Sequence, residues 1–109
     1  MAQFSLVEYV DGEKSYFAEW FTGLDAAPAA RIDRYVRRME FGNFGDSKSV
    51  GKGVRELRID FGPGYRVYYG IDKGRIILLL GGGTKRGQTR DVRKAIDRWI
   101  TYKERKRER

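Results

Sequence analysis

The chain has 109 residues with a net charge of +8, and it contains no cysteine and no histidine. This length suits one domain with a modest core, and the missing cysteines exclude disulfides and thiolate-bound zinc. The missing histidines remove the usual general base near neutral pH and the commonest ligand of transition metals, so we expect no transition-metal site. A magnesium site built from carboxylates stays possible in principle, but the sequence has no clustered acidic motif for one, and we expect no metal and no cofactor.

The first forty residues predict one strand and a pair of helices. Residues 4–10 are β-prone and end at the turn signal Asp11-Gly12. Apolar side chains recur close to helical spacing in residues 15–24 and again in residues 25–40. We expect these two helices to form a hairpin that covers one face of a sheet. The first residues lack the basic and apolar segments that a signal peptide needs.

The middle of the chain predicts a long loop and then three strands. Residues 42–53 contain four glycines and few apolar side chains, so we expect a mobile loop there. Strands are expected at residues 54–60, 65–71 and 75–80, joined by short turns, and the third has the apolar run of a strand covered on both faces. The three glycines at 81–83 then predict a loop that leaves this buried strand.

The last quarter predicts one amphipathic helix with a charged end. Apolar side chains recur at helical spacing in residues 89–102, whereas residues 103–109 have none and should fray or extend as a solvated helix. The expected order is β-α-α-β-β-β-α, an α+β fold with a small, twisted, mostly antiparallel sheet in a single domain of residues 1–109. The longest apolar run, residues 76–80, is too short to span a bilayer, and we expect a cytoplasmic protein with no membrane contact.

Nearly all of the excess positive charge lies in the last quarter of the chain. Residues 84–109 hold 11 basic and 4 acidic residues, a net of +7, whereas the other 83 residues hold 12 basic and 11 acidic ones. A basic block of this kind attracts polyanions and releases counterions when it binds them. Charge alone leaves three interpretations open: a nucleic-acid partner, an acidic protein partner, or a helix that only keeps the protein soluble.

Two arginines on neighbouring expected strands form the first candidate site. Side chains alternate between the faces of a strand, which places Arg58 beside Glu56 and Arg66 beside Tyr68 on outward faces. In a hairpin these residues become cross-strand neighbours, so that Arg58 and Arg66 stand near Glu56. The cluster is either an ordinary surface salt bridge or, with further cations, a site for an anion. Strict alternation turns Arg55 to the inner face.

The expected glycine loop supplies those further cations. Three consecutive glycines can bring backbone N–H groups toward a ligand, and Lys85 and Arg86 follow directly, with Gln88 and Arg90 just beyond. The loop leads into the start of a helix, where unpaired N–H groups favour an anion. The alternative is a flexible connector that is basic by chance.

Three stretches, taken in order, resemble the RelE/ParE toxin superfamily, and most closely its HigB-like, phage-derived Gp49-like branch. They are Glu56-Leu57-Arg58, Tyr65-Arg66-Val67-Tyr68-Tyr69 and Gly82-Gly83-Thr84-Lys85. The resemblance implies a RelE-like fold and the toxin of a type II toxin–antitoxin system. Such toxins are addiction-module killer proteins that inhibit translation as mRNA interferases, which are ribosome-dependent endoribonucleases that need no metal.

The resemblance also implies roles for individual residues. Arg58 and Arg66 would stabilise the charge that develops on the phosphate, and Lys85 would bind a flanking phosphate or protonate the departing oxygen. Glu56 would accept the proton of the ribose 2′-OH, with Asp91 as the alternative. The residues expected to bind RNA are Arg55, Tyr68, Arg86, Gln88 and Arg90, with Tyr68 either stacked on a base or simply packed in the core.

Other functions and partners remain open at this stage. Some members of the superfamily use a histidine or tyrosine near the last strand and helix, and this chain has neither where its last strand leads into its last helix, which leaves the general base and acid unassigned. A ParE-like inhibitor of DNA gyrase would share the fold, as would a non-catalytic RNA- or protein-binding module. The expected partners are the ribosome, mRNA and a cognate antitoxin, usually a helix-turn-helix protein, with an acidic segment that complements the basic last quarter.

Overall fold

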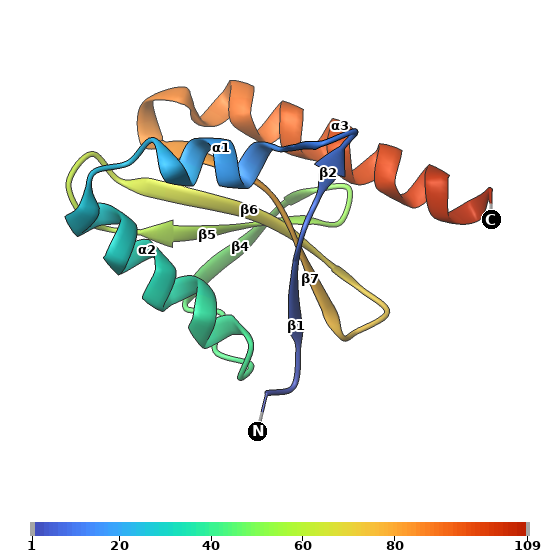
Figure 1. Cartoon of the computed structure of the whole chain (residues 1–109), viewed down its shortest axis with the longest axis horizontal. Helices are drawn as coiled ribbons and strands as arrows, with labels where there is room; N and C mark the ends of the chain where they lie inside the picture. Colours follow the sequence, from blue (N-terminus) through green and yellow to red (C-terminus); the bar gives the residue numbers. More distant parts are fainter. Residues whose placement is uncertain (1, 109) are drawn as a thin grey trace.

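The computed structural model describes residues 2–108 and has the expected α+β fold. Figure 1 shows a five-stranded sheet with α1 and α2 on one face and α3 on the other. In chain order the elements are β1 (Ser5–Glu8), β2 (Val10–Asp11), β3 (Lys14–Ser15), α1 (Tyr16–Thr22), α2 (Ala26–Met39), β4 (Asp46–Gly51), β5 (Val54–Ile59), β6 (Tyr65–Asp72), β7 (Ile76–Thr84), the 3₁₀ turn η1 (Lys85–Gly87) and α3 (Gln88–Arg107). Met1 and Arg109, the two ends of the predicted domain, lie outside the described residues.

The sheet has the strand order β1-β7-β6-β5-β4. Every neighbouring pair is antiparallel except β1 and β7, which run parallel with Ser5 opposite Ile76. The sheet is therefore mostly antiparallel, as predicted. β2 and β3 form a separate two-stranded ribbon that leads into α1.

Side-chain alternation along the central strands builds an apolar layer on each face of the sheet. Val67 of β6 belongs to one layer together with Phe17 of α1 and Val36 of α2. Leu80 of β7 belongs to the other layer together with Trp99 of α3. The apolar run of β7 is explained by this arrangement, because helices cover the strand on both faces. None of the described helices has the length and apolar character that crossing a membrane requires.

The predicted mobile loop at residues 42–53 is wrong over half of its length, because Asp46–Gly51 forms β4, the outer strand beside β5. The Tyr69 hydroxyl bonds to Ser47 Oγ at 2.9 Å, and the rings of Phe44 and Tyr69 stack with centroids 6.0 Å apart. Backbone pairing at the edge of a sheet needs no apolar pattern, so the polar sequence of this segment gives no sign of the strand.

The predicted glycine loop is also wrong, because Gly81, Gly82 and Gly83 lie inside β7. A β-carbon on Gly82 would collide with the Trp20 ring, and one on Gly83 would collide with the Asp91 carboxylate. The glycines therefore allow α1 and α3 to approach the strand closely, and they form no loop around a ligand. Only the turn η1 separates β7 from α3.

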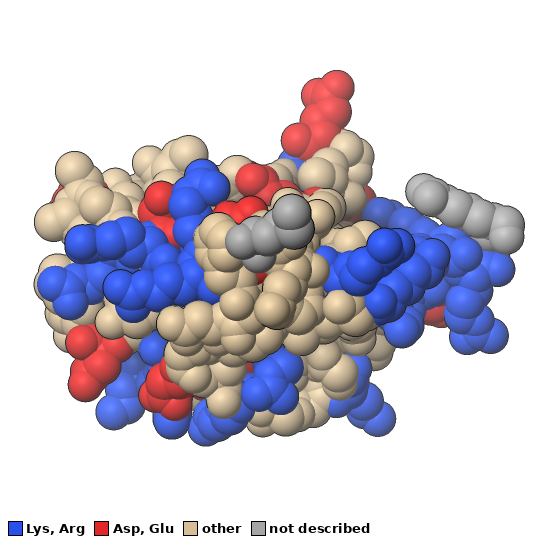
Figure 2. All heavy atoms as spheres, turned by 90° about the horizontal axis from the view of Figure 1, so that it is seen from below, with Lys and Arg blue, Asp and Glu red and all other residues tan. Residues whose placement is uncertain are grey.

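The charged end of the chain extends as a helix, one of the two predicted alternatives, because α3 continues to Arg107, and this end is docked on the rest of the protein. Lys106 pairs with the buried carboxylate of Asp72 at the end of β6, and the Tyr102 hydroxyl donates to the same carboxylate at 2.7 Å. Arg105 lies 3.4 Å from Asp11. These contacts with residues distant in sequence hold the end of α3 on the sheet and on the β2–β3 ribbon. Figure 2 shows Lys and Arg side chains crowded at this end of the molecule.

A β-carbon at position 70 tests the close contact between β6 and α3. Gly70→Ala places a methyl group inside the van der Waals contact distance of three Trp99 ring atoms. We expect the free energy of unfolding to fall by about 1–3 kcal/mol, the usual cost of overpacking a core. The measurement is urea denaturation followed by circular dichroism. Gly23→Ala is the control, since its β-carbon meets only backbone oxygens at 3.6 and 3.8 Å, and a loss as large in this variant would contradict the explanation.

The docking of α3 should depend on pH through Asp72. Hydrogen bonds from Lys106 and Tyr102 hold the pKa of Asp72 below its ordinary value. A carboxyl with a lowered pKa stabilises the fold above its unfolded pKa, and this contribution disappears as the pH falls through the folded pKa. We therefore expect the stability difference between wild type and Asp72→Asn to be constant above about pH 5 and to shrink below about pH 4. Denaturation curves measured across this range, with Glu104→Gln of α3 as the control, test the dependence.

Candidate functional site

Three cationic side chains converge on one hollow, which we call the basic hollow. Arg58, Arg66 and Lys85 line a cavity of about 310 Å³ together with Asp46 and Asp60. The three cations come from β5, β6 and η1, and two separate backbone contacts bring these elements to the hollow.

Backbone register accounts for the two arginines. Arg58 and Arg66 are directly opposite each other in the β5–β6 ladder, and the ladder has no irregularity between these strands. Both side chains therefore lie on the face of the sheet that α3 covers, together with Glu56 and Tyr68, as alternation predicts. Lys85 reaches the hollow because its backbone N–H donates to the carbonyl of Gly64 at 2.8 Å, which holds η1 beside the β5–β6 turn.

A buried network lies beneath the hollow. Glu56 has no exposed surface, and its Oε1 lies 3.4 Å from Nη1 of Arg66, whose side chain is 9% exposed. Gln88 Nε2, in the first turn of α3, donates to the other carboxylate oxygen at 2.8 Å. Each oxygen of Glu56 thus has a partner within the protein, so Glu56 holds Arg66 and the start of α3 in place, and its complete burial keeps it away from a ligand.

Tyr68 is buried beside this network. It is 1% exposed, and its hydroxyl lies close to the Glu56 carboxylate. Burial raises the pKa of Tyr68, and the neighbouring Glu56 carboxylate raises it further. The hydroxyl therefore keeps its proton at neutral pH, and the buried ring cannot stack on a base. The interpretation of Tyr68 as a core residue is the one that the structure favours.

The two carboxylates at the hollow differ in their pairing. Asp46, at the start of β4, lies 3.3 Å from Arg58 and fixes that guanidinium from the edge of the sheet. Asp60, just after β5, is exposed and has no ion pair within 4 Å among the residues that the structure describes. The place of these two carboxylates at the hollow could not be predicted from the sequence. The sequence predicted a loop around Asp46, and no motif or spacing distinguishes Asp60.

The structure places the other residues predicted to bind RNA in three different surroundings. Arg86 and Arg90 line a second depression of about 650 Å³ with Asp91, and burial raises the pKa of Asp91 there. Gln88 is turned inward to Glu56. Arg55 is on the opposite face of β5 from Arg58, since the strand alternates without a bulge. Only some of the predicted residues can therefore contact one ligand. Within residues 2–108, no group of three or more His, Cys, Asp or Glu side chains is placed to hold a metal ion.

The sequence of this chain matches one family model and one relative from another organism. The family model described as "Phage derived protein Gp49-like (DUF891)" matches residues 19–100, three quarters of the chain. An uncharacterized protein of Haemophilus influenzae is 46% identical over 80 residues, which cover 72% of this chain and 81% of that protein. The residues that match the family model run from α1 into α3 and include all three cations of the basic hollow.

Removing the charge of Glu56 tests whether the buried network supports the hollow. In Glu56→Gln the guanidinium of Arg66 stays buried without a counterion, and breaking a buried pair in this way costs about 3–5 kcal/mol. We expect a loss of that order in urea denaturation. Asp46→Asn breaks the more exposed pair with Arg58 and should cost less than about 1 kcal/mol. Equal stability of Glu56→Gln and wild type would show that the network is not a structural support.

Proposed function

This chain belongs to the family of phage-derived, Gp49-like proteins, and on that premise we propose that it is the toxin of a toxin–antitoxin pair and cleaves mRNA on the ribosome without a metal ion. The proposal includes membership of the RelE/ParE superfamily. Both rest on the order of the three sequence stretches and on the α+β fold with its sheet between helices.

The observation that carries the proposal is the convergence of Arg58, Arg66 and Lys85 on one hollow of about 310 Å³. Guanidinium groups donate several hydrogen bonds in a fixed plane and match the oxygens of a phosphate. The ion pairs of Arg58 with Asp46 and of Arg66 with Glu56 hold both groups in place before a ligand arrives. Such preorganised donors stabilise charge that develops in a transition state.

In the proposed reaction, the 2′-oxygen of a ribose attacks the adjacent phosphorus and the bond from phosphorus to the next 5′-oxygen breaks. The products are a 2′,3′-cyclic phosphate and a 5′-hydroxyl. Arg58 and Arg66 stabilise the five-coordinate phosphorus in the transition state, and Lys85 gives a proton to the leaving 5′-oxygen.

Asp60 is the carboxylate that we assign to accept the 2′-OH proton. Glu56, the acceptor expected from the sequence, is completely buried, and each of its oxygens has a partner within the protein. Asp91, the alternative, lines other depressions together with Trp20. Asp60 lines the hollow itself and is exposed, so it can approach a ribose bound against the two arginines.

The cations outside the basic hollow can contact the rest of the RNA and the proposed partners. Arg86 and Arg90 line the second depression and can bind phosphates that flank the cleaved bond. The exposed basic end of α3 offers an attractive surface to ribosomal RNA or to an acidic segment of a cognate antitoxin.

Induced expression in bacteria with mapping of mRNA ends tests this function. Wild type should arrest growth and produce translation-dependent cuts within coding regions. Arg58→Gln combined with Lys85→Gln should reduce the cuts by about 100-fold or more, as expected when transition-state donors are lost. Arg34→Gln combined with Arg38→Gln is the matched control, because these exposed arginines on α2 lie on the other side of the sheet.

Three other outcomes would contradict parts of the proposal. Growth arrest with gyrase-linked DNA breaks would identify a ParE-like gyrase inhibitor, and no toxicity would favour a non-catalytic binding module. Full cleavage by Asp60→Asn in a folded protein would remove Asp60 from the mechanism.

A further inference from the structure

A cleft lies where β7 extends beyond the end of β1, and we call it the α1–α3 cleft. It joins the second depression, of about 650 Å³, to a neighbouring one of about 300 Å³, and both are lined by Trp20 of α1, Gly82 of β7 and Asp91 of α3. These volumes are within the range of roughly 300–1,000 Å³ that is usual for ligand sites. Since β1 pairs with β7 only as far as Leu79, the part of β7 that follows is flanked on this side by α1 and α3.

The middle of the cleft holds a carboxylate without a counterion. Asp91 is half-buried, and among residues 2–108 it has no ion pair within 4 Å. Burial raises the pKa of Asp91, although Arg90, Lys94 and Arg98 act on it from a distance in the opposite direction. The carboxylate can therefore accept hydrogen bonds from a ligand.

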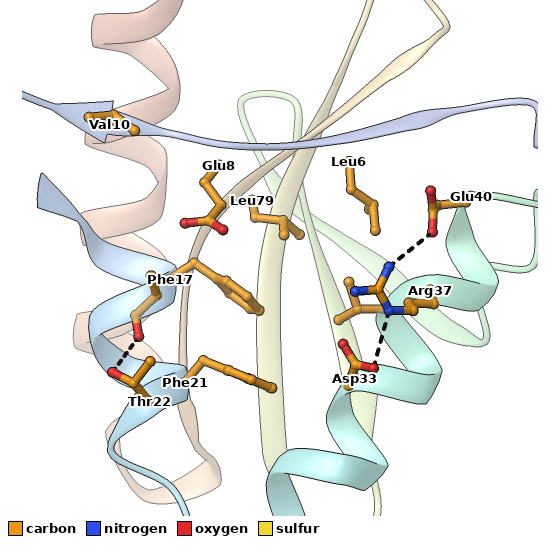
Figure 3. Close-up of a pocket in the computed structure, with 12 residues that line it drawn as sticks. Leu6, Glu8, Val10, Phe17, Phe21, Thr22, Asp33, Arg37, Glu40 and Leu79 are labelled. Atoms are coloured by element: carbon orange, nitrogen blue, oxygen red, sulfur yellow. Dashed lines mark hydrogen bonds and ion pairs between the residues drawn. The ribbon is translucent and has the colours of Figure 1, made fainter. Parts of the chain in front are cut away.

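The carboxylates of another cavity are already paired. Between α1 and α2, the Arg37 guanidinium lies 3.2 Å from Asp33 and 3.7 Å from Glu40 (Figure 3). Those carboxylates are satisfied by a side chain of the protein, whereas Asp91 has cations near it but none in contact. A half-buried carboxylate without partners costs free energy, and N–H donors of a ligand would recover it.

Cations stand at both ends of the α1–α3 cleft. Arg86 and Arg90 line the end beside η1, and Lys94 and Arg98 line the other end. Lys85 of the basic hollow directly precedes Arg86 in η1, so the hollow and the cleft meet there. Phosphate groups on either side of a ligand in the middle of the cleft would therefore meet positive charge.

Arg98 is fixed in place by two contacts that do not neutralise it. Its Nη1 donates to the carbonyl of Leu80 at 2.7 Å, and its guanidinium lies 3.6 Å from the centroid of the Tyr16 ring. Lys14 and Glu19 also line this end of the cleft, but they pair with each other at 3.4 Å. The charge that remains for a ligand at this end is therefore positive.

The donor pattern of guanine matches this cleft. A carboxylate only accepts hydrogen bonds, and it does so through two oxygens. Guanine carries two neighbouring donors, N1–H and the 2-amino group, on its Watson–Crick edge, whereas adenine and cytosine have an acceptor beside the amino group and uracil has a single N–H there. The half-buried ring of Trp20 lines both depressions and offers an aromatic surface to the base.

We propose that the α1–α3 cleft binds a guanosine that has a phosphate on both its 5′ and its 3′ side. Asp91 accepts hydrogen bonds from N1–H and the 2-amino group, Trp20 contacts the base, and the cations at the two ends bind the phosphates. A guanosine within an RNA strand and a free guanosine 3′,5′-bisphosphate share this chemistry. The inference goes beyond the proposed cleavage of mRNA, because it concerns binding alone.

Binding measurements with matched ligands test the proposal. The free ligands are the 3′,5′-bisphosphates of guanosine, inosine and adenosine. The RNA ligands are short strands of uridine with guanosine, inosine or adenosine in the middle, and they carry 2′-O-methyl groups that prevent cleavage. Titration calorimetry measures the affinity of the bisphosphates, and fluorescence anisotropy measures that of the labelled strands.

We expect guanosine ligands to bind about tenfold or more tightly than inosine ligands, which lack the 2-amino donor, and than adenosine ligands. Asp91→Asn should reduce this preference to within about twofold, because an amide has one acceptor and would meet the second donor with a donor of its own. Asp97→Asn, at an exposed position of the same helix, removes the same charge and should keep the preference. Circular dichroism checks that both variants are folded.

The cations should contribute to affinity without contributing to the choice of base. Arg86→Gln combined with Lys94→Gln should weaken the binding of guanosine bisphosphate about tenfold and keep its preference over inosine bisphosphate, since these side chains contact phosphates. Arg34→Gln combined with Arg38→Gln is the matched control, because it removes two exposed charges from α2.

The same measurements identify the source of the guanosine. Tighter binding of the guanosine strand than of the bisphosphate would assign the cleft to RNA, and equal or weaker binding would assign it to a free nucleotide. Equal affinities for guanosine, inosine and adenosine ligands would overturn the proposal, as would a preference for guanosine that Asp91→Asn leaves unchanged. No binding of any ligand at concentrations up to about 1 mM would also overturn it. Because the methylated strands cannot be cleaved, these results are independent of the messenger-cleavage assay.

Discussion

The buried carboxylate of Glu56 connects the three parts of the protein that the candidate site needs. It pairs with Arg66 on β6, accepts a hydrogen bond from Gln88 in the first turn of α3, and itself belongs to β5. A fully buried charge is costly unless it is paired and hydrogen-bonded, and here both oxygens have partners. The position of the Arg66 guanidinium and the start of α3 are therefore set by the same group.

Close packing around small residues sets the distance between the helices and the sheet. Gly70 makes room for the Trp99 ring, Gly82 for the Trp20 ring, and Gly83 for the carboxylate of Asp91. Each missing side chain removes a contact that would otherwise push a helix outward. At its far end, α3 is held by Asp72, which pairs with Lys106 and accepts a hydrogen bond from Tyr102. The helix is thus fixed at both ends by buried carboxylates and in its middle by tryptophan packing.

The two faces of the sheet carry opposite chemistry. On the α3 face, Arg58, Arg66 and Lys85 converge with pairing carboxylates, an arrangement suited to a phosphate. On the other face, a cavity between α1 and α2 has apolar side chains at its base and the carboxylates of Glu8, Asp33 and Glu40 at its rim. The sheet separates the two cavities, so that a ligand in the basic hollow does not reach the acidic side chains on the other face.

The sequence by itself determined the elements with a local signature. Helical spacing located α1, α2 and α3, apolar content located β5, β6 and β7, and alternation placed Arg58 and Arg66 on one face with Arg55 on the other. Only the tertiary structure decided that residues 46–51 join the sheet, that Gly81, Gly82 and Gly83 lie in a strand, and that Glu56 is buried under Gln88. These features depend on backbone pairing and close approach between segments far apart in the chain, and such contacts leave no periodic pattern in the residues that make them.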